Sequence, residues 1–180
     1  GEQVGSYTIG GLGAPVNFWN YNITYSLGKL TITPATLVIT ADDLSKTYGD
    51  NDPALTYSQT GLVNHLVNGV MISDSINGSL TRDGAGTRPG QNAGDYDITQ
   101  GTLAVNKPSN YNVVFNDGTL TINKKDLTVA AVTDTKQYDG TTASSGLPSG
   151  VGLVNGTVDG VDINDTLSGT QAFQSKDVLG

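Results

Sequence analysis

The chain repeats itself, and this feature constrains its fold more than any other. The stretch "NYNITYSLGKLTITPATLVITADDLSKTYGD", which starts at Asn20, aligns without a gap with "NYNVVFNDGTLTINKKDLTVAAVTDTKQYDG", which starts at Asn110. The period from position 20 to position 110 is therefore 90 residues. Self-similarity at a fixed period indicates an array in which one structural unit recurs along the chain.

The alignment continues on both sides of these stretches. Upstream, "GSYTI" at Gly5 matches "GDYDI" at Gly94, an offset of 89 residues; downstream, "GVMISDSINGS" at Gly69 matches "GVDINDTLSGT" at Gly160, an offset of 91 residues. Loops tolerate insertions and deletions of one residue, so we expect loops between the matching segments. The sequence thus predicts that the chain is a segment of a tandem array of modules.

The composition favours strands over helices. The chain has 24 Gly and only 14% charged residues, and it lacks long stretches with apolar residues at helical spacing. Short strands joined by many turns are expected, so the predicted fold class is all-β. A small β-sandwich with immunoglobulin-like character is the first expectation. The alternative is a β-grasp-like single curved sheet with a short helix or turn around residues 62–67.

Charge and residue content exclude several classes of protein. With 17 acidic against 9 basic residues the formal charge is -8, and such a surface repels phosphate backbones and anionic lipids. We therefore expect neither nucleic-acid nor membrane-surface binding. The chain has no Cys for disulfides or thiolate sites, and no stretch is apolar enough to span a bilayer. No cofactor is expected.

Alternating apolar residues on either side of an Asp-Gly pair predict a β-hairpin. If Asp117 and Gly118 form its loop, then Phe115 lies opposite Leu120 and Val113 lies opposite Ile122. The first copy predicts the same hairpin across Leu27 and Gly28, with Tyr25 opposite Leu30 and Ile23 opposite Ile32.

A new apolar run begins after each predicted hairpin, which places module boundaries near residues 35 and 125. Residues 1–34 are then the C-terminal part of one repeat, 35–124 a complete repeat, and 125–180 the N-terminal part of a third. A joint of two or three residues leaves little freedom, and Pro34 restricts one joint further. Successive modules are therefore predicted to form an elongated rod.

The two outer pieces are predicted to be incomplete modules. A half module leaves a sheet edge unpaired and an apolar face uncovered. We expect the central module to fold unaided, and the N-terminal piece of one chain to be able to complement the C-terminal piece of another.

The order of the short motifs is similar to that of a known family. The stretch "TYGDNDPALTY", followed by "TGLVN", "GSLTR", "GDYDI" and "NYNVVFNDGTLTI", resembles the MBG repeat of the YGX type, and "KQYDGTT" at Lys136 resembles the opening of the related YDG repeat. Such repeats occur in large bacterial surface and secreted proteins, including filamentous-haemagglutinin-like adhesins. The resemblance implies an extracellular or cell-surface, all-β, non-catalytic spacer, and it carries over no catalytic residues.

Asp50 and Asp52 form an Asp-x-Asp stretch that resembles the start of a calcium loop. In the second copy, Gly140 and Thr142 stand at these places, so a metal site shared by both modules cannot use this pair. Asp, Asn, Gly and Pro are also the residues that tight turns select. We interpret the segment as a turn, with a calcium site in this one module as the weaker hypothesis.

Two other acids and two lysines are retained at the repeat spacing. Asp74 aligns with Asp165, which favours a structural role such as capping a turn. Lys46 aligns with Lys136, and we interpret both as solvated lysines whose stems cover apolar surface. The alternative for the lysines is a cross-link to an asparagine side chain, for which Asn22 and Asn112 are the candidates. His65 is interpreted as an incidental surface residue.

Phe18 and Trp19 are the candidate ligand-binding residues. Pro108 and Ser109 replace them in the other copy, so the aromatic pair is not required by the repeat itself. Loop aromatics can stack on a sugar ring or anchor another protein. The alternative is that Trp19 packs on its own half module or on the neighbouring joint.

Two functions remain open on these grounds. The first is a spacer repeat that extends the binding region of an adhesin for attachment or biofilm formation, with neighbouring repeats as its partners. The second is a recognition module for a glycan or a host or bacterial surface protein, centred on Phe18, Trp19 or the loop of residues 83–92. No enzyme is expected, because no nucleophile, base and orienting group are assembled.

Overall fold

The protein is all-β. The computed structural model describes residues 3–10, 20, 22 and 24–175, and within them the helical segments are the short 3-10 turns η1 (Pro89–Gln91) and η2 (Pro108–Asn110). The predicted fold class is thereby confirmed, whereas the immunoglobulin-like sandwich, the rod and the three module ranges stay predictions. No helix in the described residues is long and apolar enough to cross a membrane.

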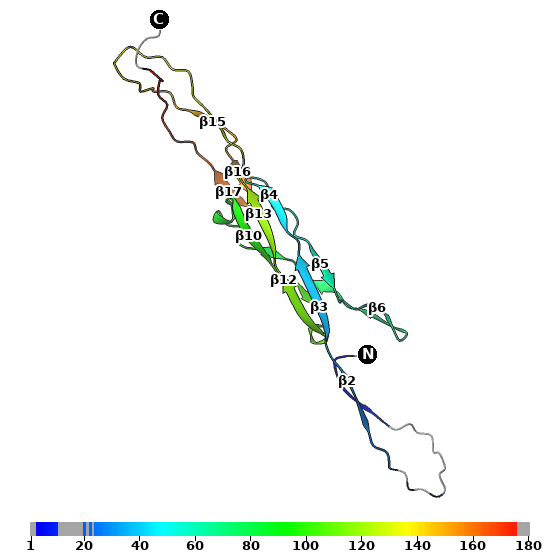
Figure 1. Ribbon diagram of the computed structural model, residues 1–180. Helices are drawn as coiled ribbons and strands as arrows, with labels where there is room; N and C mark the ends of the chain where they lie inside the picture. The colour runs from blue at the N-terminus through cyan, green and yellow to red at the C-terminus, as the bar shows by residue number, and fades with distance from the viewer. Residues whose placement is uncertain (1–2, 11–19, 21, 23, 176–180) are drawn as a thin grey trace. The chain divides into compact units, whose positions relative to one another are not determined.

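The chain divides into two compact units, and each is assembled from segments that are far apart in the sequence (Figure 1). Unit 1 consists of Gly1–Asp42, Thr56–Leu80 and Gln100–Asp117, and unit 2 of Asp43–Leu55, Thr81–Thr99 and Gly118–Gly180. The predicted complete repeat, 35–124, therefore contributes to both units.

Unit 1 is organised around one three-stranded sheet in the order β12 (Tyr111–Asn116), β3 (Ala35–Ala41) and β5 (Tyr57–Thr60). The strands β12 and β3 run parallel, side by side in Figure 1, and β5 is antiparallel to β3. Along β3, alternate residues Leu37, Ile39 and Ala41 are buried, as expected when one face of a strand meets a core. Leu37 and Ile39 pack with Val105 and Tyr111.

Three two-stranded ribbons complete unit 1. They are β1 (Gly5–Ile9) with β2 (Gly28–Ile32), β6 (Asn64–Val67) with β7 (Val70–Ser73), and β8 (Ile76–Asn77) with β11 (Ala104–Val105). All three pairs are antiparallel. The β6–β7 connection is a two-residue turn in which Asn68 and Gly69 both have positive φ, 47° and 79°, as a type I′ turn requires.

Unit 2 contains a four-stranded sheet in the order β4 (Leu44–Thr47), β13 (Gly118–Asn123), β10 (Gly94–Thr99) and β9 (Thr81–Arg82). The strand β13 lies at the centre of this sheet, parallel to β4 and antiparallel to β10. The central side chains Ile98, Leu120 and Ile122 are at most 2% exposed. This sheet supplies one side of the site described below.

Two further ribbons of unit 2 come from the C-terminal third of the chain. They are β14 (Thr128–Ala130) with β15 (Ser149–Val151), and β16 (Asn155–Val158) with β17 (Val161–Asn164). The β16–β17 turn, Asp159 and Gly160, has φ values of 48° and 76° and is again of type I′. Its sequence offset from the Asn68–Gly69 turn is 91 residues, the offset of the flanking sequence match.

The repeat seen in the sequence is also a repeat of strand pairing. Gly5 pairs with Ile32 and Tyr7 with Leu30 in one copy, and Gly94 pairs with Ile122 and Tyr96 with Leu120 in the other. Because the register is the same in both copies, the one-residue slip in the sequence falls between the paired strands. This outcome agrees with the expected placement of slips in loops.

The predicted hairpin around Asp117 and Gly118 is wrong. The strand β12 pairs with β3 and the strand β13 with β4 and β10, so Phe115 lies opposite Ile39 rather than Leu120. Neither Asp117 nor Gly118 has the positive φ that a two-residue hairpin turn needs. The chain continues extended through this pair because strands from distant parts of the sequence offer both halves a parallel partner.

Two other expectations are also corrected. In the first copy, β2 pairs with β1 rather than with the segment around Tyr25, and the pairing expected for Ile23 lies outside the described residues. The segment 62–67 holds no helix, because Asn64–Val67 forms strand β6. A helix was only one option of the β-grasp alternative, and the type I′ turn at Asn68 instead extends the segment into a hairpin.

Candidate functional site at the joint between two repeats

Buried charges gather in unit 2, where the first repeat meets the hairpin of the next. We call this group the joint cluster, and its members come from the strand β4 and the turn after it, the strand β9, the turn η1 and the tip of the β16–β17 hairpin. The joint cluster consists of Lys46, Asp52, Arg82, Gln91 and Asp159. The members lie up to 113 residues apart in the sequence, so the fold alone brings them together.

Lys46 is at the centre of the joint cluster. Its side chain is 3% exposed, and its Nζ lies 2.7 Å from Gln91 Oε1, 2.7 Å from Asp52 Oδ1 and 3.0 Å from Asp159 Oδ2. An ammonium group has three N–H donors, and here each has an acceptor. The interpretation of Lys46 as a solvated lysine is therefore wrong: two acids and an amide from three separate segments enclose it.

Arg82 is the second buried cation, with a side chain 1% exposed. Its Nε and Nη2 donate to the two oxygens of Asp52 at 2.6 and 3.1 Å, the bidentate geometry that guanidinium favours with carboxylates. Its Nη1 donates to the carbonyls of Asp83 and Gly90 at 2.9 and 2.8 Å. Arg82 thereby fixes both the Asp52 turn and the loop that carries Gln91.

The charges of the joint cluster balance, with two cations against Asp52 and Asp159. Burial favours the neutral form of Asp52, but hydrogen bonds and positive charge from Arg82 and Lys46 outweigh it, so the pKa of Asp52 lies below its ordinary value. An acid held ionised by two cations is a poor proton donor near neutral pH. Such an arrangement favours holding segments together over acid-base chemistry.

The hairpin tip and the turn after β4 hold each other through backbone groups as well. The N–H of Asp52 donates to the carboxylate of Asp159 at 2.9 and 3.1 Å, and the N–H of Asp159 donates to Asn51 Oδ1 at 3.1 Å. These reciprocal bonds need the hairpin tip to present both its carboxylate and its amide. The positive φ of Asp159, 48°, is tolerated best by Asn, Asp and Gly among the residue types.

Tyr48 forms an apolar contact beside the charges. It packs on Val158 and Ile163 of the β16–β17 hairpin and on Val154, which directly precedes β16. Gly49 makes this contact close: a Cβ placed there would lie 2.6 Å from Cγ2 of Val154, and φ is +92°. The Tyr-Gly pair thus serves as a docking surface for the hairpin of the following repeat.

The Tyr48 hydroxyl ends on an acid that the repeat retains. It donates to Asp165 Oδ1 at 2.8 Å, and Arg88 Nη2 donates to the same oxygen at 3.2 Å. Burial, the hydrogen bond to Asp165 and its negative charge raise the pKa of Tyr48. The structural role predicted for Asp165 takes this form: its carboxylate accepts hydrogen bonds from a tyrosine and an arginine of the preceding repeat.

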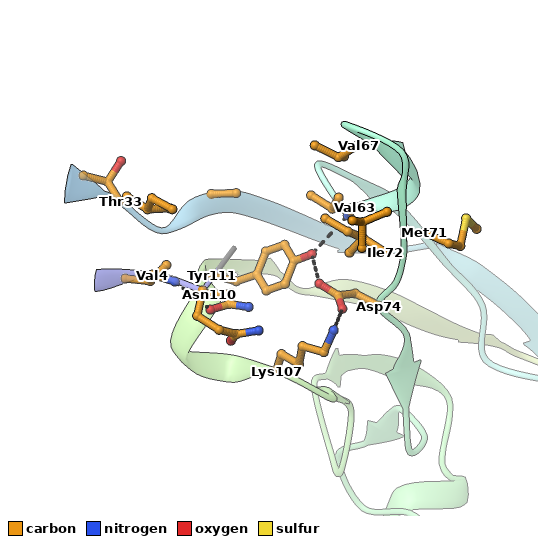
Figure 2. Close-up of a pocket in the computed structure, with 14 residues that line it drawn as sticks. Val4, Thr33, Val63, Val67, Met71, Ile72, Asp74, Lys107, Asn110 and Tyr111 are labelled. Atoms are coloured by element: carbon orange, nitrogen blue, oxygen red, sulfur yellow. Dashed lines mark hydrogen bonds and ion pairs between the residues drawn. The ribbon is translucent and has the colours of Figure 1, made fainter. Parts of the chain in front are cut away.

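Unit 1 holds the counterpart acid at the polar end of an open pocket (Figure 2). Asp74 accepts a 2.7 Å hydrogen bond from the Tyr111 hydroxyl and pairs with Lys107 Nζ at 2.6 Å, and the N–H of Val63 donates to the Tyr111 oxygen at 3.1 Å. Burial opposes ionisation, but the bonds from Lys107 and Tyr111 lower the pKa of Asp74. Burial and the bond to Asp74 raise the pKa of Tyr111.

Most of the remaining lining of this pocket is apolar, with Gln3, Thr33 and Asn110 as polar exceptions, and its volume is about 590 Å³. Its apolar lining includes Val63 just before β6, Val67 of β6, Val70, Met71 and Ile72 of β7, and Ile32 at the end of β2. Val70 and Met71 are each 59% exposed. The size lies in the usual range for binding pockets, roughly 300–1,000 Å³.

The candidate metal-binding and ligand-binding residues from the sequence lie in different surroundings. The Asp50 side chain is exposed, and its N–H donates to Thr47 O at 3.0 Å, which closes the turn. Asp52 faces two cations instead of joining Asp50 in a site, and in the described part of the chain no three His, Cys, Asp or Glu side chains gather as metal ligands would. Phe18 and Trp19 lie outside the described residues.

Sequence reasoning missed three members of the joint cluster: Arg82, Gln91 and Asp159. A signal existed for Asp159, because "VDGV" at residues 158–161 and "VNGV" at 67–70 place a turn-forming dipeptide between valines. Arg82 ends the motif "GSLTR", but the motif indicates no partner for it, and no pattern marks Gln91. Tertiary structure sets the partners of both residues.

Comparison with known families accounts for most of the chain. Residues 37–121 match the MBG domain (YGX type), and residues 123–180 match the YDG domain. No curated protein and no solved structure is significantly similar to the chain. The joint cluster thus links residues of the first match with Asp159 of the second. From residue 37 to residue 180, the chain belongs to the MBG (YGX type) and YDG families of repeat domains.

Proposed function

We propose that the chain is a non-catalytic spacer of a bacterial cell-surface or secreted adhesin, where it extends a binding region for attachment or biofilm formation. The carrying observation is the joint cluster, in which Lys46 has three acceptors drawn from both repeats. Charges that could serve catalysis are used to hold consecutive repeats to each other. A spacer needs such joints, because its reach is set by the copy number only when neighbouring repeats stay packed.

The second candidate is a recognition module for a glycan or a surface protein. The aromatic pair Phe18 and Trp19 favours it on sequence grounds. The loop of residues 83–92 offers less support, because Arg82 and Lys46 bind its backbone and Gln91 internally. Recognition by this chain therefore depends on the aromatic pair.

A display experiment separates the two candidates. A lectin of known specificity is presented on a bacterial surface through one or two tandem copies of the chain, alongside the chain displayed without the lectin. The glycan surface is coated with a thick polymer layer, which keeps the bacteria at a distance from the glycans. If the chain is a spacer, attachment of the bacteria should increase with the number of copies. The spacer proposal also predicts that the double variant F18A/W19A attaches as well as the unmodified chain.

The matched arm is a glycan array probed with the chain alone. A spacer leaves the array unlabelled. Labelling that disappears in F18A/W19A would establish the recognition module and refute the spacer proposal.

A further inference from the structure

We infer that the apolar pocket of unit 1 is a docking site for another repeat, which enters with a Lys-x-Tyr-Gly turn like that of Lys46–Gly49. The inference rests on the proposed function, since it assumes that repeats are joined in series. The occupant is a further copy of the strand and turn at residues 44–52.

The first argument is the equivalence of the two hairpins. Strands β6 and β7 of unit 1 correspond to β16 and β17 of unit 2 at an offset of 91 residues, with the same strand lengths and the same type of turn. The segment before each hairpin is also equivalent: "GLVN" starts at Gly61 and again at Gly152. Asp74 and Asp165 each donate their N–H to the carbonyl eleven positions earlier, Val63 and Val154.

The second argument is the difference in burial between the equivalent apolar side chains. In unit 2, Val154, Val158 and Ile163 are 9%, 5% and 0% exposed, with Tyr48 packed on them. In unit 1 their counterparts are half-buried and line the pocket: Val63, Val67 and Ile72. The same apolar face is therefore covered by a tyrosine turn in one unit and open in the other.

The third argument concerns the strand β13 of unit 2 and the equivalent strand of unit 1. In unit 2, β13 pairs with β10 on one edge and with β4 on the other, and β4 leads directly into the Tyr48 turn. Its counterpart in unit 1, β2, pairs with β1, and within the described residues no strand pairs with its other edge. A strand equivalent to β4 added there would carry its turn toward the pocket, which Ile32 and Thr33 at the end of β2 also line.

The fourth argument compares two polar members of the joint cluster, Gln91 and Asp159, with the residues at the equivalent places in the sequence. Asn68 stands at the place of Asp159, which removes a carboxylate from the hairpin tip. At the offset of 89 residues, Glu2 stands at the place of Gln91, which restores one. Glu2 lies outside the described residues, so this point concerns its place in the sequence alone. In the sequence, each joint thus has one amide-bearing and one carboxylate-bearing residue at these two places.

The test extends the chain with a second copy of residues 35–89, placed directly before Gly1. Gly1 corresponds to Gly90, so the addition rebuilds one complete repeat in the register of the array. Amide hydrogen exchange is measured in two regions, β2 and the β6–β7 hairpin, in the extended and the original chain. We expect exchange to slow at least about tenfold in both regions, a factor that corresponds to roughly 1.4 kcal/mol.

A variant of the added copy separates docking from mere completion of the sheet. Tyr48→Ala in the added copy should keep the protection of β2 and lose that of β6–β7. The substitution removes the side chain that packs on the hairpin, whereas the backbone N–H of residue 48, which in the known joint bonds the end of β13, is kept. In the extended chain that keeps Tyr48 in the added copy, slower exchange in β2 with no change of exchange in β6–β7 would overturn the inference. Protection of β6–β7 in the original chain at high concentration would assign the pocket to an unlinked second copy and also overturn it. Neither readout depends on adhesion, so the spacer proposal can fail independently.

Discussion

The hydroxyl of Tyr48 donates a 2.8 Å hydrogen bond to Asp165, which lies 117 residues further along the chain. The tyrosine belongs to the MBG match and the acid to the YDG match. This bond, the apolar contact beside it and the joint cluster are three linked parts of one interface. Each part makes a separate prediction.

Replacing Lys46 should weaken the joint strongly. Lys46→Ala leaves the partly buried Asp159 with fewer donors and removes one of the two cations that face Asp52. Breaking a buried pair by deleting one partner costs about 3–5 kcal/mol. Denaturant unfolding followed through the amides of β16 and β17 measures this loss.

The control for this experiment is Lys136→Ala, the same change one repeat later. Lys136 pairs with Asp139 and is 26% exposed, and exposed pairs contribute about 0–1 kcal/mol. Equal losses in the two variants would contradict a special role of the joint cluster.

Removing the hydroxyl of Tyr48 should destabilise the protein, because the hydroxyl bonds Asp165. Tyr48→Phe deletes the bond to Asp165 and keeps the packing on Val154 and Ile163, so we expect a loss of roughly 1–2 kcal/mol. Tyr138→Phe is the matched control, because Tyr138 is the repeat counterpart and is 72% exposed. Thermal unfolding of both variants decides the point, and a Tyr48→Phe protein as stable as the control would refute it.

A side chain at Gly49 should disrupt the contact with the following hairpin. Gly49→Ala places a Cβ 2.6 Å from Cγ2 of Val154 and strains a φ of +92°. Gly160→Ala imposes comparable backbone strain at φ +76°, with no atom within 4 Å of the new Cβ. We expect Gly49→Ala to cost about 1–3 kcal/mol more than Gly160→Ala, the range for overpacking. Comparable unfolding midpoints would show that the hairpin does not press on the turn.

The stability of the joint should fall in acid. The pKa of folded Asp52 lies below the ordinary value of 3.8, so its contribution is present in full above that pH and is lost as the pH falls through the lower folded value. Free energies of unfolding between pH 7 and pH 2 give the slope. Asp52→Asn should reduce the slope below pH 4, whereas Asp50→Asn, a change at an exposed side chain two positions away, should leave it unchanged.

The strands were largely predictable from the sequence, and their partners were not. Alternation located β12 and β13, because the period of two depends on local residues only. The hairpin inferred from Asp117 and Gly118 failed because β3 and β4, more than seventy residues earlier, provide parallel partners that local pattern cannot reveal. The two type I′ turns were accessible, since Asn68-Gly69 and Asp159-Gly160 carry the strongest short-range hairpin signal.

The sequence indicated where the candidate site lies, but not which residues meet there. Retention of Lys46 and Tyr48 in both copies indicated that the turn matters, but two of the three acceptors of Lys46 lie 45 and 113 residues away. Repetition within one chain shows which residues the fold requires. It does not show that a residue contacts the neighbouring module. The two partners of such a contact occupy different positions of the repeat, so aligning the copies does not pair them.

The parallel pairing of β3 with β12 has a mechanical consequence. Six consecutive residue pairs, from Tyr111 with Ala35 to Asn116 with Thr40, bind the two strands along their length. If the start of β3 and the end of β12 are pulled in opposite directions, one strand has to slide along the other. The hydrogen bonds between the two strands then carry the force at the same time. A hairpin pulled at its two ends opens one bond at a time. Under tension, this sheet should therefore resist shearing, and its lifetime would be set by its rate of unfolding under force.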